Sequence, residues 1–287
     1  MSLQKEVYHI IKPHSRSKYR VLQGYWQECA PTRRDRILYC DLHAATGKIW
    51  DKEGQLFGNG SVLIAAQSPI CEQIHAIEIN RVRFEQLKRC VANFPKVSIY
   101  HSDCNIVILE ILASLPAGRK TFFFLDPEGL IYRKTIVPCH ELHWETVERI
   151  ANVPGSEILI TLPLYAPLRE IGHIWRNATS NRAQRATENL TAFFGTGNWM
   201  IGRKEYRRWP RIYCRDRLAQ HYEYRGAIFI VNQTRAPQYY LLFLSNEAQS
   251  FAAMQQIMGR EFSRVGRQLR LPFSNSESPV FTFIYED

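Results

Sequence analysis

Four segments of this chain run from apolar residues directly into a carboxylate, and this repeated pattern constrains the fold more than any other feature. The first, residues 36–47 (RILYCDLHAATG), passes into Asp41 and then into a turn of small residues that ends at Gly47. The later ones reach Glu78, Asp103 and Asp126. Because the carboxyl ends of parallel strands meet at one edge of a sheet, the pattern predicts a doubly wound sheet with a ligand site along that edge.

Strand-like and helix-like segments alternate up to about residue 164, where the pattern changes. Strands are predicted at 36–42, 74–79, 96–101, 120–125 and 156–164, with helices at 81–93, 105–115 and 139–152 and a loop at 48–59. Two β-rich runs at 227–233 and 239–246, separated by turn-prone residues, predict an antiparallel hairpin. A helix is predicted after it, at 247–262.

This order resembles the seven-stranded sheet of class I methyltransferases more than the parallel sheet of a dehydrogenase. The predicted fold class is α/β: a Rossmann-like, doubly wound, seven-stranded and mostly parallel sheet with a C-terminal antiparallel hairpin and a basic, mainly helical insertion. Residues 1–165 and 227–287 are expected to form the Rossmann-like methyltransferase domain. Residues 166–226 are expected to form the basic and aromatic insertion.

The net charge of +10 is concentrated in one part of the chain. Residues 169–225 carry twelve Lys and Arg against five Asp and Glu, a local net charge of +7, with aromatic residues interleaved. Cations on phosphates and rings on bases suit nucleic acid. Buried rings with solvated arginines, or a helical docking unit for a protein, fit the same composition. Under the first interpretation, nucleic-acid contacts are expected from Arg203, Lys204, Arg207, Arg208 and Arg211.

Cysteine usage and hydropathy predict a reduced, cytoplasmic protein without a membrane segment. The seven cysteines form no CxxC pair, no apolar run approaches the roughly 20 residues that span a bilayer, and the N-terminus lacks the apolar region of a secretion signal. His140 and His143, expected on one helical face beside Cys139 and Glu141, lack further ligands for zinc, so no metal site is predicted. The sequence has neither a GxxxxGKS loop nor a GxSxG motif.

In a sheet of the methyltransferase type, the acids at the strand ends have expected roles toward S-adenosylmethionine. Asp41 and Gly47 would hold the amino-acid part, with His43 either touching the ligand or filling the pocket wall. Glu78 would bind both ribose hydroxyls, because only an acceptor pair matches the diol, and Asp103 would meet the adenine amino group. The structural alternatives are a turn cap for Asp41, a helix N-terminal surface position for Glu78 and an N-cap for Asp103.

The segment Asp126-Pro127-Glu128-Gly129 is the sharpest local motif. Amine methyltransferases carry D/N-P-P-aromatic at this point, where the acid accepts hydrogen bonds from the amine and aligns its lone pair with the sulfonium methyl group. Glu and Gly in the third and fourth positions remove the ring that would stack on a flipped base. Asp126, Pro127 and Glu128 are the predicted catalytic residues, with Glu128 a base, a cation ligand or a solvated loop residue.

Taken together, the motifs resemble the three-Cys-motif partner family (TcmP), bacterial proteins regarded as methyltransferase-like. The resemblance runs through the helix after Lys18, YCDLHAATG, the loop to Gly60-Ser61, IEIN, LDPEG, ILITLPL and YYLLFLSNEAQSFAAMQQIM, so it covers most of the chain. It implies that Lys18, Ser61 and Cys104 join the cofactor-binding residues. It also implies a partner, a radical-SAM-like three-Cys-motif protein.

Members of that family carry D-L-F-A-G-x-G, G-S-P and L-D-P-x-G. Here His43 replaces the aromatic residue, Ala45 the first loop glycine and Val62 the proline, which bears on cofactor affinity. The D-x-H-A opening and the long first loop also resemble a large-subunit ribosomal RNA adenine methyltransferase family, which has D-P-P-Y at the fourth strand. The leading hypothesis is therefore an S-adenosylmethionine-dependent methyltransferase of the TcmP type, its acceptor open between nucleic acid and protein. The alternative is a catalytically silent Rossmann-like module that binds nucleic acid or a partner protein.

Overall fold

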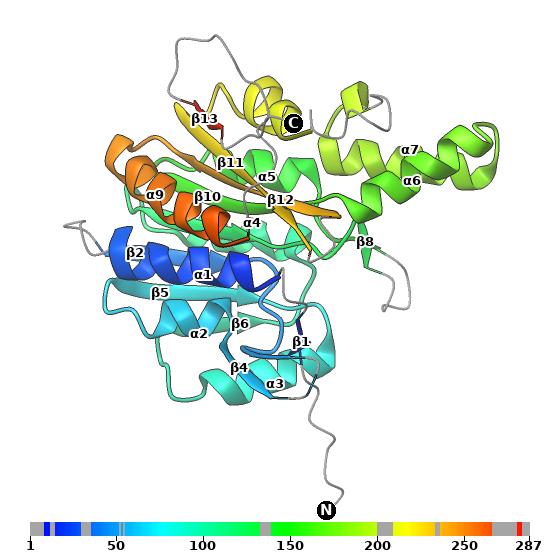
Figure 1. The fold of residues 1–287 in the computed structure, drawn as a ribbon. Helices are drawn as coiled ribbons and strands as arrows, with labels where there is room; N and C mark the ends of the chain where they lie inside the picture. The colour runs from blue at the N-terminus through cyan, green and yellow to red at the C-terminus, as the bar shows by residue number, and fades with distance from the viewer. Residues whose placement is uncertain are drawn as a thin grey trace, which may run out of the picture.

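The computed structural model describes residues 9–11, 15–29, 36–51, 53, 55–132, 139–199, 209–232, 236–265 and 280–282. Its centre is an eight-stranded sheet in the order β13-β11-β12-β10-β7-β2-β5-β6 (Figure 1). The strands are β2 (Ile37–Asp41), β5 (Cys71–Ile77), β6 (Val97–Tyr100), β7 (Thr121–Leu125), β10 (Ser156–Pro163), β11 (Tyr224–Val231), β12 (Pro237–Ser245) and β13 (Val280–Thr282).

Among the described strands of this sheet, β12 alone runs antiparallel to its neighbours, β10 and β11. The pairs β2–β5, β2–β7, β5–β6 and β7–β10 are parallel. The short strand β13 is added in parallel at the edge, beside β11. The other seven strands form the mostly parallel sheet with a C-terminal hairpin, which confirms the predicted fold class.

The central strands are apolar because helices cover both faces of the sheet. β2, β7 and β10 are buried along their whole length, and alternate residues enter two different hydrophobic clusters. Phe122 and Phe124 share a cluster with residues of α1, α2, α3 and α9, whereas Phe123 and Leu125 share one with α4, α5, α6 and α7. The helices are α1 (Arg16–Gly24), α2 (Ser61–Ala66), α3 (Arg81–Val91), α4 (Cys104–Ser114), α5 (Trp144–Ala151), α6 (Tyr165–Arg176), α7 (Asn181–Phe194), α8 (Trp209–Arg211) and α9 (Ala248–Val265).

The segment after β10 is mainly helical, as predicted. Helices α6 and α7 pack against each other and extend past the end of the sheet (Figure 1). Short helical turns follow at Gly197–Trp199 and Ile212–Arg217. Most described rings of this segment are buried in the hydrophobic cluster that holds β7 and β10, as the core-packing interpretation predicts: Phe193, Phe194, Trp199, Trp209, Tyr213 and Tyr222.

The basic residues named for nucleic-acid contact lie almost wholly outside the described residues. Arg203, Lys204, Arg207 and Arg208 fall in the undescribed range 200–208. Arg211 is described by its backbone, as the last residue of α8. Contact between these five residues and nucleic acid therefore stays a prediction.

The predicted loop at 48–59 was wrong. Strands β3 (Lys48–Trp50) and β4 (Leu56–Asn59) form an antiparallel pair there, and β1 (His9–Ile10) adds to β3 in parallel. Ile49 is buried with Ile11 and Tyr19 in a small separate cluster. The pairing depends on the distant segments that supply this cluster, which a local pattern does not reveal.

The helix predicted from residue 139 begins at Trp144 instead. Cys139–His140 form β9, which pairs with β8 (Ile131–Tyr132). His143 has an extended backbone, and its N–H donates to Asn105 Oδ1 at 2.8 Å. The expectation that His140 and His143 share a helical face was therefore wrong. Among the described residues, no helix combines the length and apolar character needed to cross a membrane.

Candidate functional site

Backbone register sets how far each acid stands beyond the sheet. Asp41 is still within the ladder, where it pairs with Ala76 of β5 and Phe124 of β7. Glu78 and Asp126 each lie two residues beyond those partners. Because side chains alternate between faces with a period of two, both acids keep the face of the sheet to which Asp41 belongs but stand past its edge.

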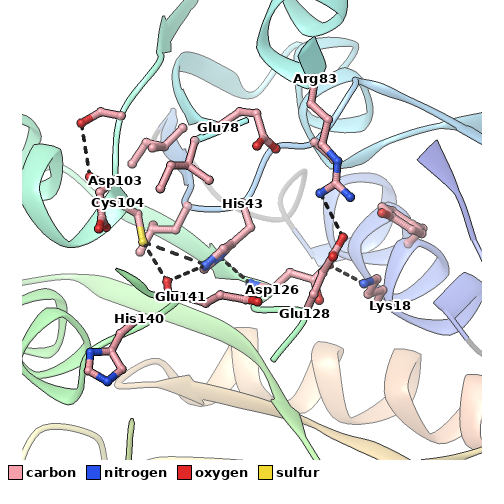
Figure 2. A pocket seen from close by; sticks show the side chains of 16 residues that line it. Lys18, His43, Glu78, Arg83, Asp103, Cys104, Asp126, Glu128, His140 and Glu141 are labelled. Carbon is pink, nitrogen blue, oxygen red and sulfur yellow. Dashed lines mark hydrogen bonds and ion pairs between the residues drawn. The ribbon is translucent and has the colours of Figure 1, made fainter. Parts of the chain in front are cut away.

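Glu78 and Asp126 face a cavity at this carboxyl edge, with room for a few water molecules, about 60 Å³ (Figure 2). Of the predicted site residues, those that line it are Lys18, His43, Glu78, Asp103, Cys104, Asp126 and Glu128. Those that do not are Asp41, Gly47, Ser61 and Pro127. The structure thus brings together the residues expected around ribose, adenine and acceptor, while the remaining four lie behind them.

The lining is rich in acids. It holds five carboxylates, those of Glu78, Asp103, Asp126, Glu128 and Glu141, against two permanent cations. The cations come from Lys18 of α1 and Arg83 of α3. An excess of carboxylates in a partly enclosed site favours a ligand that carries positive charge.

Asp41 has no exposed surface and organises the turn after β2. Its Oδ2 accepts a hydrogen bond from the Tyr39 hydroxyl at 3.0 Å, and its Oδ1 accepts one from the His43 N–H at 3.1 Å. The Ser61 hydroxyl donates a third. Burial raises the pKa of Asp41 to about 7, against these three hydrogen bonds. In this arrangement Asp41 acts as a turn cap, so its influence on a ligand passes through the turn.

The turn itself keeps the backbone shape of a glycine loop despite its sequence. Ala45 has a φ of 52° and Gly47 a φ of 80°, both in the left-handed region. A Cβ on Gly47 would lie 3.0 Å from Cys90 Cβ and 3.2 Å from Leu87 Cδ1. The Gly60 N–H donates to the Gly47 carbonyl at 2.7 Å, which ties the turn to the start of α2. Ala45 therefore holds, at a steric cost, a conformation that glycine adopts freely.

Glu78 combines a structural and a site-facing role. It is 5% exposed, its Oε1 accepts a hydrogen bond from the Asn80 N–H at 2.6 Å, and its carboxylate also accepts one from the Ala45 N–H. Burial raises the pKa of Glu78, and the nearby Arg83 opposes that shift. The carboxylate is thus held in place by backbone amides while it lines the cavity.

Asp103 is the N-cap of α4 and lines the cavity as well, so the two roles weighed for it coexist. Its Oδ1 accepts hydrogen bonds from the Asn105 N–H at 2.8 Å and from Asn105 Nδ2 at 2.9 Å. Among the described residues, none donates a hydrogen bond to its Oδ2. Oδ2 therefore remains available as an acceptor for a ligand amine.

His43 is a neutral imidazole that joins three loops. The Asp126 N–H donates to its Nδ1 at 3.1 Å, so the ring proton lies on Nε2 and is donated to the Glu141 carbonyl at 3.1 Å (Figure 2). Burial lowers the pKa of His43, which keeps the ring neutral. Of its two weighed roles, His43 fills the pocket wall in this structure, since both nitrogens are occupied.

Cys104 contributes a thiol to the same wall. Its Sγ donates to the Glu141 carbonyl at 3.3 Å, and burial raises the pKa of the thiol well above its ordinary value. A protonated, buried thiol is a poor nucleophile. Cys104 therefore shapes the cavity rather than attacking a substrate.

Two ion pairs cross the open side of the cavity. Lys18 Nζ pairs with Asp126 Oδ2, and Arg83 Nη1 pairs with Glu128 Oε1 at 3.0 Å (Figure 2). The Glu128 side chain is 57% exposed, whereas Pro127 is buried. The turn after β7 is thus linked to α1 and to α3 by side chains that line the cavity.

Of the lining residues that the sequence analysis did not name as site residues, three carry a charged or imidazole side chain: Arg83, His140 and Glu141. The Glu141 carboxylate accepts hydrogen bonds from the backbone N–H groups of Gly129, at 2.8 Å, and Glu128. Burial raises the pKa of Glu141 to about 7. Glu141 directly follows the short strand β9, and Arg83 lies in the helix α3. Neither residue ends an apolar run, which is the pattern by which the other acids were found.

His140 and His143 contact each other through their ring nitrogens. His140 Nδ1 and His143 Nε2 lie 3.0 Å apart, and His140 Nε2 donates a hydrogen bond to Asn189 Oδ1 at 3.2 Å. No group of three or more His, Cys, Asp or Glu within the described part of the chain has a geometry that could hold a metal ion. The expected absence of a metal site stays an expectation.

No family model and no curated protein matches the sequence. Among solved structures, a Legionella pneumophila protein of the family named DUF519 is similar with a TM-score of 0.54 and 11% identity, over 88% of this chain and 92% of that one. Spermidine synthase from Thermotoga maritima (TM-score 0.45, 10% identity) is matched over 94% of this chain and 68% of its own. A protein titled an rRNA methylase from Clostridium thermocellum (0.42, 8%) is matched over 82% and 98%. At these identities the likeness concerns the fold alone.

Proposed function

We propose that this chain binds S-adenosylmethionine in the cavity at the carboxyl edge of the sheet and transfers its methyl group to an acceptor held beside Asp126. The observation that carries the proposal is the convergence of Glu78, Asp103 and Asp126, from three strand ends, on one cavity. Topology supports it, because ligands of open α/β sheets bind at the carboxyl ends of the strands.

The carboxylate acceptors of the cavity match the hydrogen-bond donors of this cofactor. The ribose hydroxyls would donate to Glu78, whose position is fixed by the Asn80 N–H. The adenine amino group would donate to Asp103 Oδ2, which has no hydrogen-bond donor among the described residues. The excess of carboxylates in the lining suits the positive sulfonium and ammonium groups.

The cofactor supplies an electrophilic methyl group, so the work left to this chain is positioning. Asp126 would accept a hydrogen bond from the acceptor nucleophile once its partner Lys18 is displaced. Glu141 holds the turn that carries Asp126, through the N–H groups of Gly129 and Glu128. His43 contributes by fixing the Asp126 backbone rather than by moving a proton.

The finer assignment within methyltransferases is the three-Cys-motif partner type. YCDLHAATG and LDPEG support it, as does the left-handed backbone that Ala45 keeps at the position of a family glycine. On this assignment the chain works together with a radical-SAM-like three-Cys-motif protein. The buried thiols of Cys40, Cys71, Cys104 and Cys214, none of them in a disulfide, favour a reducing, cytoplasmic location.

A catalytically silent module is the second candidate, and one observation favours it. The cavity of about 60 Å³ is far smaller than the roughly 300–1,000 Å³ of ordinary ligand clefts. Under the methyltransferase proposal, Lys18 and Arg83 withdraw from their carboxylate partners when the ligand enters. Under the silent-module alternative they do not, and the protein has no cofactor affinity.

Isothermal titration with S-adenosylmethionine and S-adenosylhomocysteine separates the two. We expect binding to the unchanged protein, weakened about 5- to 150-fold by Glu78→Gln, the equivalent of about 1–3 kcal/mol for poorly matched ligand hydroxyls. Glu85→Gln is the matched control, because Glu85 is exposed on α3 beside the site. Absence of heat at millimolar ligand would overturn the proposal in favour of the silent module.

A further inference from the structure

We infer that the paired helices α6 and α7 bind the phosphates of a single-stranded nucleic acid, which is the methyl acceptor. The second half of this statement rests on the proposed function, whereas the binding surface does not. The surface, here called the hairpin face, consists of cationic and imidazole side chains from both helices: Arg169, His173, Arg176, Arg182 and Arg185.

The hairpin face is continuous. Arg169, His173 and Arg176 follow one another at intervals of four and three along α6, so they share one side of that helix. Arg182 and Arg185 are three residues apart on α7. Arg182 Nη2 reaches His173 Nε2 at 2.6 Å, which joins the two helices into one surface.

The positive charge on this face is mostly uncompensated. Arg169 lies 3.6 Å from Glu170, but Arg176, Arg182 and Arg185 have no carboxylate partner among the described residues. All four arginines are exposed. Exposed arginines without carboxylate partners attract phosphate, whose oxygens match the fork of the guanidinium group.

The two guanidinium groups that contact His173 favour an anionic ligand at this point of the hairpin face. Arg176 Nη2 faces its Nδ1 at 2.8 Å, while Arg182 Nη2 faces its Nε2. A neutral imidazole accepts at one nitrogen and donates at the other, so one of these guanidinium groups meets a donor instead of an acceptor. A phosphate oxygen that accepted a hydrogen bond from one of these guanidinium groups would remove the conflict.

The hairpin face leads to the cofactor cavity. Arg169, Arg182 and Arg185 line a groove of about 680 Å³ together with His140 and two carboxylates, those of Glu170 and Glu188. His140 also lines the cavity that holds Glu78 and Asp103. His140 thus borders both spaces, so a strand held in the groove would lie beside the cavity.

An exposed ring on the hairpin face favours nucleic acid over an acidic protein. Tyr165, four residues before Arg169 on α6, is 72% exposed although most rings of this segment are buried. The Arg169 guanidinium lies 5.7 Å from the centre of the Tyr165 ring. Solvent-facing rings beside arginines stack on bases and bind their phosphates, whereas an acidic peptide uses the charges alone.

Fluorescence anisotropy with labelled single-stranded RNA and DNA of about 12 nucleotides tests this inference. We expect binding that weakens as salt rises from about 50 to about 200 mM. Arg182→Glu with Arg185→Glu should weaken it at least about tenfold and lower the salt slope by about two. Tyr165→Ala, which removes the exposed ring beside Arg169, should weaken it about fivefold or more. Lys48→Glu with Lys88→Glu is the charge-matched control, because both lysines are exposed outside α6 and α7.

Circular dichroism of each variant confirms that it folds. The inference is overturned by unchanged binding in the Arg182/Arg185 variant, by an equal loss in the lysine control, or by no binding to the unchanged protein. It is also overturned if poly-glutamate of equal charge competes as well as the oligonucleotide, which would assign the face to acidic proteins. S-adenosylhomocysteine titration of the unchanged protein keeps the two proposals apart: if it binds the oligonucleotide but not S-adenosylhomocysteine, the proposed function is contradicted and the hairpin face still stands.

Discussion

The carboxylate of Glu141 accepts a hydrogen bond from the backbone N–H of Gly129 at 2.8 Å, and this contact fastens the turn after β7 to the loop before α5. The N–H of Glu128 donates to the same carboxylate. The turn that presents Asp126 is therefore shaped by a side chain that no motif marks. The position of this turn therefore depends on Glu141 as well as on Pro127.

Replacing Glu141 by alanine should destabilise the protein and loosen the turn. Two partly buried N–H groups lose their acceptor, at a cost of about 1–3 kcal/mol. Glu141→Gln, which keeps one acceptor oxygen, should recover part of that loss. Urea unfolding measures the free energy, with Glu145→Gln, an exposed position in the first turn of α5, as the control. Equal stability of the alanine variant and the control would contradict this role.

Asp41 should make stability fall as pH rises. Its folded-state pKa is raised from 3.8 to about 7, so its contribution is fully present below about pH 4 and is lost as pH rises through about 7. Between pH 5 and pH 8 the loss is about 3 kcal/mol, from about two pH units up to the folded-state pKa at about 1.4 kcal/mol for each unit. Asp41→Asn removes this titration, so the difference between variant and parent should shift in favour of the variant at pH 8. A difference independent of pH would show that Asp41 ionises normally.

Removing the ion pair at the mouth of the cavity should ease ligand entry. Arg83 and Glu128 are held 3.0 Å apart, but the exposure of Glu128 keeps their contribution to stability below about 1 kcal/mol. Arg83→Ala should therefore leave stability nearly unchanged and speed association of S-adenosylhomocysteine severalfold in stopped-flow measurements. Arg81→Ala, in the same helical turn but outside the cavity lining, serves as the control. Association slowed by the change would mean that Arg83 recruits the ligand rather than restricting it.

Two substitutions in the turn after β2 should have opposite effects. Gly47→Ala places a Cβ 3.0 Å from Cys90 Cβ at a positive φ, so we expect a loss of about 1–3 kcal/mol in the free energy of unfolding. Ala45→Gly relieves the left-handed alanine but adds freedom to the unfolded chain, so its net effect should lie within about 1 kcal/mol of zero. Thermal unfolding of both variants measures the contrast. Equal destabilisation by the two would contradict the assigned backbone strain.

The succession of strands along the chain and the convergence of the acids could be predicted, because both follow from apolar runs that end in a carboxylate. Glu78, Asp103 and Asp126 illustrate this success. The depth of Asp41 could not be predicted, since it depends on which residue of β2 is the last to pair with β5 and β7. Register is a property of neighbouring strands rather than of one segment.

Contacts between distant segments account for the other differences. The β3–β4 pair packs Ile49 against Tyr19, and the loop of Glu141 docks on the turn after β7. Neither contact leaves a periodic trace in the sequence, because each involves one or two side chains. The burial of the rings near Tyr213 was left open by composition alone, since basic and aromatic residues suit both a core and a binding surface.

The two-residue offset of Glu78 and Asp126 from the last paired row has a consequence for natural or engineered length changes. Deleting one residue from β5 or β7 would turn the acid of that strand toward the layer of α4 and α5, and so empty the site of it. Deleting two would restore its direction but draw it back by about 6.6 Å along the strand, to the sheltered level of Asp41. The number of residues in each strand thus determines which carboxylates a ligand can contact.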